Sequence, residues 1–224
     1  MSKINYPFSF REKVHKLTKK MATQHLKLPI EGGKFYHIYK SASIGDHIFF
    51  TPGNYAFFLR KMDLIIGDMV DLMAFCLLPN HFHLFFRARE VITIKEEYVD
   101  HPVEIGHFIG EGLRKLFAVY SANLTKQEGI ADPLLDNNFS RIFIPNDDIA
   151  RQMIVYIHQN SQFHNVTDNF TNYPHSSYPL MMGKHKTLID KDSIMTLFAD
   201  MQTFIDLHQQ PTDWGSLHEY LIES

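Results

Sequence analysis

The chain has 224 residues, 45% of them hydrophobic, which is enough for one packed core and excludes a disordered or fibrous protein. The single cysteine, Cys76, excludes an internal disulfide, and no apolar stretch approaches the roughly 20 residues that span a bilayer, so we expect no membrane anchor and a cytoplasmic location. Net charge is −3, but residues 1–40 carry nine basic and two acidic side chains, so that segment stands at +7 and the rest of the chain at −10. This asymmetry predicts a basic arm that can bind phosphates and that is attached to an otherwise acidic body.

The basic residues near the start of the chain gather in one stretch. Residues 11–27 place Val14, Leu17 and Met21 at helical spacing among lysines, which predicts a short amphipathic helix. The same lysines are as compatible with the solvated face of a helix as with DNA binding. The candidate DNA contacts of this segment are Lys13, Lys16, Lys19 and Lys20.

After this segment, the hydrophobic pattern predicts alternating strands and helices. An order of strand, helix, two strands, helix, strand is typical of the ferredoxin-like α+β sandwich, in which helices cover one face of a four-stranded antiparallel sheet. A further helix follows the last of these strands. We expect strands at 35–39, 70–78, 81–89 and 139–144, and helices at 55–67, 105–124 and 147–158.

Two other stretches complete the organisation. Residues 91–104 are polar, and we expect a surface insertion there. Beyond Asn160 the sequence predicts a loop and then an amphipathic helix over 192–208. The predicted division is a basic N-terminal helical arm at 1–33, a central α+β domain at 34–160, and a C-terminal loop and helical extension at 161–224.

His81 and His83 stand two residues apart on a predicted strand. Since side chains alternate between the faces of a strand, both imidazoles point to one side and Phe82 and Leu84 to the other. Two nitrogen ligands could therefore share one cation. In a chain with 14 histidines such a pair is expected on the order of once by chance, so the spacing by itself more often reflects packing than metal binding.

The residues around this pair resemble a known family. The segment from Leu77 to Leu84, with Pro79-Asn80 before His81-Phe82-His83, is similar to the His-hydrophobic-His strand of the single-tyrosine HUH transposases, especially the branch associated with repetitive extragenic palindromes (REP). The resemblance covers roughly residues 34–180 and makes 34–160 the catalytic domain. Its other landmarks are Phe35-Tyr36-His37-Ile38-Tyr39, Leu113 to Tyr120, Phe139-Ser140-Arg141-Ile142, Tyr156-Ile157-His158-Gln159-Asn160 and His175-Ser176-Ser177-Tyr178.

The resemblance implies a DNA-nicking and joining enzyme that acts in transposition and DNA recombination. In that family a tyrosine hydroxyl attacks a phosphate in single-stranded DNA beside a hairpin, which gives a 5′-phosphotyrosyl link and a free 3′-hydroxyl. The resemblance assigns this role to Tyr120 and a divalent cation, Mg²⁺ or Mn²⁺, to His81 and His83. It also implies a homodimer. Arg114 and Lys115 flank the face of the helix that carries Tyr120 and could clamp a phosphate, although exposed helix cations are commonly just solvated.

Tyr120 also fits an ordinary structural role. It lies on the apolar stripe of its predicted helix, where a tyrosine is usually a core residue with its hydroxyl at the edge. The family often has Asn or Gln one helical turn after the tyrosine as a third metal ligand, and this chain has Leu124 there. Asn123 and Gln127 could reach the same helix face as possible third ligands.

Two other functions stay open at this point. Leu124 and the acidic body favour a domesticated DNA-binding protein that keeps hairpin recognition but has weak or no cleavage activity, with binding carried by the N-terminal basic segment. In the remaining alternative the histidine pair is structural and the chain binds a protein partner.

Overall fold

A four-stranded antiparallel sheet forms the centre of the fold, as predicted. In the computed structural model the described residues are 29–42, 47–94, 96–129, 135, 138–184, 187–210, 217 and 219–221. The strand order β2-β3-β1-β6 is that of the ferredoxin-like sandwich, with every neighbouring pair antiparallel. The bounds are β1 Phe35–Ser41, β2 Val70–Leu78, β3 His81–Ala88 and β6 Ser140–Ile144.

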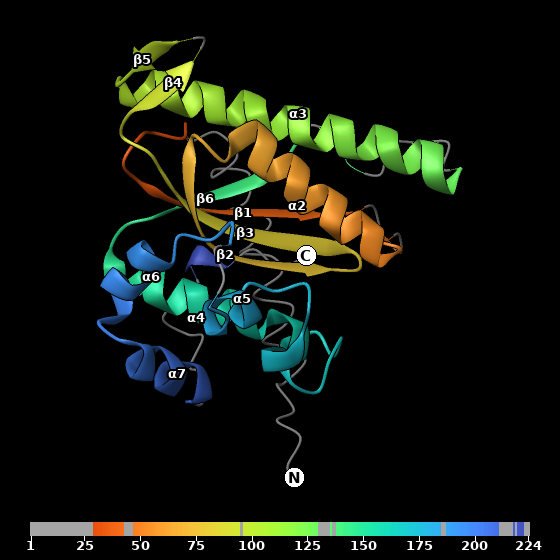
Figure 1. Cartoon of the computed structure of the whole chain (residues 1–224), viewed down its shortest axis with the longest axis vertical. Coiled ribbons are helices and arrows are strands. Elements are labelled where there is room, and N and C mark those ends of the chain that lie inside the picture. The colour runs from red at the N-terminus through yellow and green to blue at the C-terminus, as the bar shows by residue number, and fades with distance from the viewer. Residues whose placement is uncertain are drawn as a thin grey trace.

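Helices cover both faces of this sheet (Figure 1). Helices α2 (Pro52–Ile66) and α3 (Pro102–Glu128) lie on one face, and α4 (Asp147–Phe163) lies on the other. Because both faces are covered, the central strand β3 is buried along almost its whole length, with only Arg87 less than fully buried. The expected helices on one face are therefore present, and the layer formed by α4 and the C-terminal segments is an addition to the predicted sandwich.

Local signals account for the helix bounds. Pro52 and Pro102 open α2 and α3, where a missing backbone N–H costs nothing. Helix α3 ends at Gly129, whose φ of 67° lies in the left-handed region that favours glycine. The side chain of Asn146 caps α4 by accepting a hydrogen bond from the backbone N–H of Ile149 at 3.0 Å.

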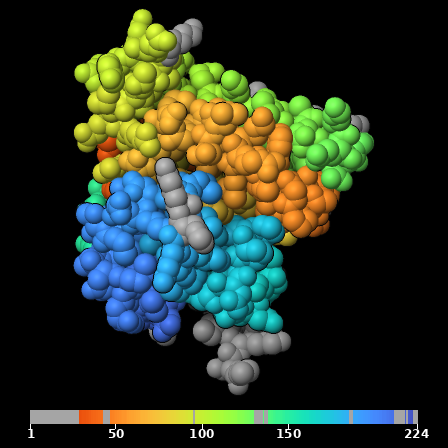
Figure 2. Space-filling view, in the orientation of Figure 1, coloured from red at the N-terminus to blue at the C-terminus, as the bar shows by residue number. Residues whose placement is uncertain are grey.

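The C-terminal segments pack beside α4 (Figure 1), and at the surface they also adjoin α2 (Figure 2), where the ring of Tyr55 stacks on that of His175. The expected single helix over 192–208 is two helices, because Ala199 adopts a φ of 66° and Asp200 then caps a new helix by accepting from the N–H of Thr203. The elements of this region are η1 Phe170–Asn172, α5 Tyr178–Met182, α6 Lys191–Phe198 and α7 Met201–Gln209.

Three other expectations from the sequence have different outcomes. The polar insertion contains two short paired strands, β4 Ile92–Ile94 and β5 Glu97–Val99. The predicted domain boundary after residue 160 falls inside α4, and the division into three parts stays a prediction. The basic helix predicted at 11–27 lies outside the described residues. None of the helices in the described ranges combines the length and apolar character needed to cross a bilayer.

A buried chain of hydrogen bonds ties α7 to α4 and β2. His208 Nδ1 donates to the carbonyl of Phe204 at 2.7 Å, so its Nε2 must accept the proton of His158 Nδ1 at 2.8 Å. His158 Nε2 then accepts from the Ser177 hydroxyl at 2.7 Å, and Ser177 Oγ accepts from the N–H of Phe75 at 2.9 Å. Each donor finds one acceptor only if both imidazoles are neutral.

A glycine pair on α3 provides a test of how this helix packs. A Cβ on Gly106 would lie 1.5 Å from the carbonyl oxygen of Ile30, whereas the nearest atom to a Cβ on Gly110 is the tip of Arg114 at 3.8 Å. We expect Gly106→Ala to lower the free energy of unfolding by about 3 kcal/mol, because backbone must move. Gly110→Ala should raise it by about 0.5–1 kcal/mol through helix propensity. Urea unfolding of both variants measures this, and equal effects would contradict the packing described.

Candidate functional site

Two strands bring histidines together on the sheet face that α4 covers. On β3 the side chains of His81 and His83 point to this face, and on β1 those of His37 and Tyr39 do the same. The ring of Tyr39 lies 5.7 Å from that of His81 and 5.1 Å from that of His83. We call this surface, defined by these four residues, the histidine face. The predicted placement of both β3 imidazoles on one side is confirmed.

Each histidine of the pair has its Nδ1 engaged by a neighbour. His81 Nδ1 lies 2.8 Å from Oδ1 of Asn80, and His83 Nδ1 lies 2.9 Å from Nε2 of His37. The Nε2 atom of His83 is buried and has no hydrogen-bond partner among the described residues. Since a metal ligand must offer a lone pair while its other ring nitrogen is held in place, this arrangement suits a cation at the two Nε2 atoms.

Helix α4 supplies the opposite wall of the site. Tyr156 packs its ring edge-on against that of His83, with the ring centroids 5.7 Å apart. Asn160, one turn later, is fully buried; its Nδ2 donates to the Tyr156 carbonyl, and its Oδ1 has no partner within the described part of the chain. His164 follows after another turn, with its ring 4.5 Å from that of His81. Tyrosine, amide and imidazole thus follow one another along a single face of the helix, since residues four apart are neighbours there.

Burial keeps the histidine pair neutral. The pKa of His81 is lowered to about 3, first by burial and then by His164, with Asn160 acting in the opposite direction. Burial, followed by repulsion from His37, lowers the pKa of His83 well below its usual value. Asn160 is thus close enough to affect both rings, although its Oδ1 makes no hydrogen bond of normal geometry in the described ranges. Lone pairs for a cation are therefore available at neutral pH.

The structure does not bring Tyr120 to this site. Its ring packs against Phe49 and Phe58, and Phe58 in turn contacts Phe82, the β3 residue that faces α2 and α3. The Tyr120 hydroxyl donates to the carbonyl of Ile48 at 2.8 Å, and the side chain is fully buried. The sheet therefore separates Tyr120 from the histidine pair, and burial raises its pKa strongly.

The two residues considered as a third ligand lie with Tyr120 on α3. Gln127 accepts a hydrogen bond from Nδ2 of Asn54 at 3.2 Å, and Asn54 belongs to α2. The Nδ2 of Asn123 is buried without a partner among the described residues, on the same helix. Since α3 covers the face of the sheet opposite to the histidines, neither amide is brought to them.

The expected cationic contacts lie elsewhere. Arg114 and Lys115 are exposed on α3, and Arg114 forms an ion pair of 2.5 Å with Glu111 on its own helix. The structure does not bring either residue to the histidine face. The other predicted DNA contacts, Lys13, Lys16, Lys19 and Lys20, lie outside the described residues.

The site does not depend on a cluster of strongly ligating side chains. Among the residues that the structure describes, no three His, Cys, Asp or Glu side chains gather around one possible metal position. The candidate ligands are instead His81, His83 and the amide oxygen of Asn160. A site of two imidazoles and one amide leaves coordination positions for water and phosphate oxygens.

An open cavity lies on the other side of Tyr156. It has a volume of about 580 Å³ and is lined by Tyr156, residues of α4 and η1, and the end of α7. Its walls include the amides of Gln159, Gln162 and Asn169 and the ring of Phe170. Tyr156 therefore stands between this cavity and the histidine face.

The sequence contained a signal for the α4 residues. Tyr156 and Asn160 have the spacing of a tyrosine and an amide one turn later, and they belong to a segment that resembles the transposases. His37 carried a second signal, because it alternates with Tyr39 on a predicted strand. Neither spacing says which face of the sheet the residues meet.

Comparison with family profiles and with curated proteins finds no match for this chain. A solved structure described as "Structure of the REP associates tyrosine transposase bound to a REP hairpin" is similar to it with 14% sequence identity and a TM-score of 0.49. The similarity covers 73% of this chain and 92% of the other.

Proposed function

We propose that the protein is a metal-dependent DNA-nicking and joining enzyme in which Tyr156, not Tyr120, is the nucleophile. The observation that carries the proposal is the placement of Tyr156 and Asn160 against His81 and His83 across the sheet–helix interface. The reaction follows from the sequence resemblance to single-tyrosine HUH transposases, and the geometry supports this choice of residues.

The polar groups of the site fit a divalent cation. His83 Nε2 and Asn160 Oδ1 are buried polar atoms without partners in the described part of the chain, and such atoms are costly unless something satisfies them. His81 would complete the set with Nε2, because its Nδ1 is taken by Asn80. Mg²⁺ or Mn²⁺ held there would offset negative charge that grows on the phosphoryl group during attack. The metal's identity follows from the resemblance.

Tyr156 would attack the scissile phosphate of single-stranded DNA next to a hairpin. A bond forms between the tyrosine oxygen and phosphorus while the bond to the 3′-oxygen breaks, which leaves a 5′-phosphotyrosyl link and a free 3′-hydroxyl. Because the link conserves the energy of the phosphodiester, the 3′-hydroxyl of another strand can later reverse the step and join to it. The enzyme can therefore act as a strand transferase in transposition and recombination.

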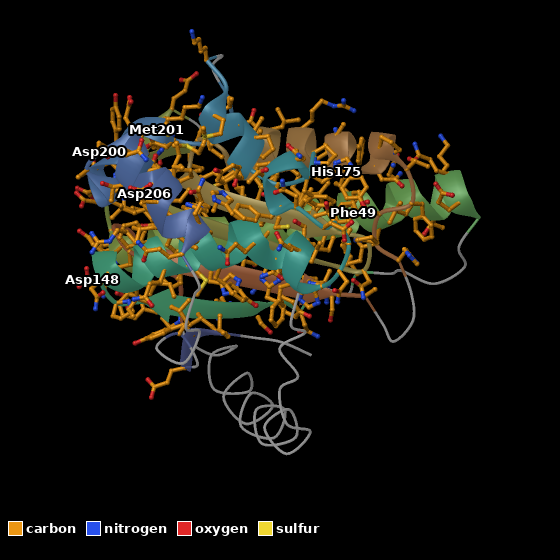
Figure 3. All side chains as sticks on the ribbon, turned by 90° about the horizontal axis from the view of Figure 1, so that it is seen from below. Phe49, Asp148, His175, Asp200, Met201 and Asp206 are labelled. Carbon is orange, nitrogen blue, oxygen red and sulfur yellow. The ribbon has the colours of Figure 1, made fainter. Side chains whose placement is uncertain are left out.

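The cavity beside Tyr156 is the proposed place for the single strand. Amide side chains such as Gln159 and Asn169 can hydrogen-bond base edges, and an aromatic ring such as that of Phe170 can contact a base face. Figure 3 shows Asp148, Asp200 and Asp206 at the end of the molecule away from Phe49. The backbone N–H of Phe49 donates to the Pro79 carbonyl at the turn before His81, so the histidine pair lies toward the end of the molecule away from these three aspartates.

The assignment of Tyr156 bears on one of the two reasons for expecting a loss of cleavage. The binding-only alternative rested on the acidic body and on Leu124, which stands one turn after Tyr120, and the assignment of Tyr156 removes the second of these reasons. One turn after Tyr156 the chain has Asn160, the residue type that the family uses. A homodimer and binding by the N-terminal basic segment stay proposals that follow from the resemblance and from the charge distribution.

The first test is metal-dependent formation of a covalent adduct. Wild-type protein incubated with end-labelled hairpins that carry single-stranded flanks should give, with Mn²⁺, a protein–DNA species that survives denaturing electrophoresis. Chelation before mixing should prevent it, and His81→Ala/His83→Ala should reduce it by about 10²-fold or more. Salt-sensitive binding without any adduct, across a broad hairpin library, would favour the binding-only alternative and refute the enzyme.

A further inference from the structure

His37, on β1, lies directly against the histidine pair and has no part in the function proposed so far. Its ring is stacked on that of His83 with the centroids 5.2 Å apart, and its Nε2 lies 2.9 Å from His83 Nδ1. Both side chains are buried, with 0% and 1% of their surface exposed. The contact is therefore a hydrogen bond sealed from water.

One proton must lie between the two nitrogens, and it can belong to either ring. Both rings are buried, and a charged imidazole without an ion-pair partner is costly there, so both rings are neutral. A neutral imidazole carries one N–H and one lone pair. If His83 donates from Nδ1, its Nε2 offers a lone pair. If His37 donates, the Nε2 of His83 carries the proton and cannot bind a cation.

The surroundings distinguish these two states. A proton on His83 Nε2 would be a buried donor near the buried acceptor Asn160 Oδ1, yet both atoms lack a hydrogen bond among the described residues. If both atoms instead present lone pairs, no hydrogen bond can form between them, and a cation bound by both would satisfy them. On the other side of the ring, His37 Nδ1 is buried and has no hydrogen-bond partner among the described residues.

We propose that His37 is a positioning residue for the metal site: its Nε2 accepts the Nδ1 proton of His83, which holds His83 in the tautomer whose Nε2 lone pair faces the cation. The inference rests on the proposed function for the presence of a metal. A ligating histidine commonly donates its second nitrogen to a carboxylate or carbonyl. A neutral imidazole in this place orients the ligand without adding negative charge where a DNA phosphate must arrive.

The experiment compares wild type with His37→Phe and His37→Gln, first without metal and then by titration with Mn²⁺. Long-range ¹H–¹⁵N correlation spectra of metal-free protein report which nitrogen of His83 is protonated. We expect Nδ1–H in wild type and in His37→Gln, whose amide oxygen can still accept, and Nε2–H in His37→Phe. Calorimetry should show Mn²⁺ affinity lowered about 10-fold or more by His37→Phe and largely retained by His37→Gln. Thermal unfolding of each variant controls for folding.

The outcomes separate this inference from the function on which it rests. Nε2–H on His83 in the metal-free wild type, or equal Mn²⁺ affinity in wild type and a folded His37→Phe, would overturn the role of His37. If His37→Phe does not fold, the tautomer of His83 in wild type and the Mn²⁺ affinity of His37→Gln decide whether His37 has this role. If Mn²⁺ binds as expected but no hairpin yields an adduct, the nuclease fails while the role of His37 stands. If wild type binds no Mn²⁺, both fail.

Discussion

Replacing Tyr156 by Phe should abolish the covalent protein–DNA adduct, whereas replacing Tyr120 by Phe should leave it. Phenylalanine has no oxygen to attack phosphorus, so Tyr156→Phe should lower the rate of strand cleavage by about 10³-fold or more. Tyr120 lies beyond the sheet from the histidines, and Tyr120→Phe removes only the hydrogen bond to the Ile48 carbonyl. We expect it to cost about 1 kcal/mol of stability.

The two substitutions form a matched pair, since each removes a single hydroxyl from a buried tyrosine. Single-turnover cleavage of a labelled hairpin measures both, and retained Mn²⁺ binding by Tyr156→Phe shows that the site is intact. The reverse pattern, with an adduct in Tyr156→Phe and none in Tyr120→Phe, would return the nucleophile to α3. An adduct lost in both variants despite normal folding would show that the two faces of the sheet are coupled in a way that the contacts do not explain.

Acid should destabilise the fold strongly through its buried histidines. Burial lowers the pKa of His208 to about 4, and the Phe204 carbonyl only partly opposes this. Because the folded pKa lies below the unfolded value of about 6.5, the unfolded state takes up the proton first as pH falls. The stability is complete above pH of about 6.5 and is lost progressively between about 6.5 and 4. His208 alone should account for about 3 kcal/mol between neutral pH and about 4.5, at about 1.4 kcal/mol per pH unit.

Urea unfolding at a series of pH values measures this slope. His208→Gln should be less stable at neutral pH, because His158 loses its acceptor, but its free energy of unfolding should fall less steeply with acid. His107→Gln, which removes an exposed histidine on α3, serves as the matched control. An unchanged slope in His208→Gln would mean that the α7–α4 hydrogen-bond chain does not hold its histidines neutral.

The sequence by itself predicted the central sheet and the orientation of the histidine pair. Strand and helix periods are local properties, so β2 Val70–Leu78 was predicted to the residue, and the start of β3 followed from the Pro79-Asn80 turn before it. The orientation of His81 and His83 to one face follows from strand alternation alone. The break at Ala199 was not predicted, because the apolar stripe continues through it and a positive φ at alanine leaves no mark in the pattern.

Only the tertiary structure decided which tyrosine meets the histidines. Tyr120 and Tyr156 both lie on the buried side of a helix, and the sequence offers an amide near each of them. Periodicity identifies the buried side of a helix but not the face of the sheet that it covers, because that depends on how the chain crosses the sheet and on which side chains pack there. The contact of His37 with His83 was hidden for the same reason: the register of β1 on β3 makes these two residues, 46 apart in sequence, diagonal neighbours, and no local pattern records it.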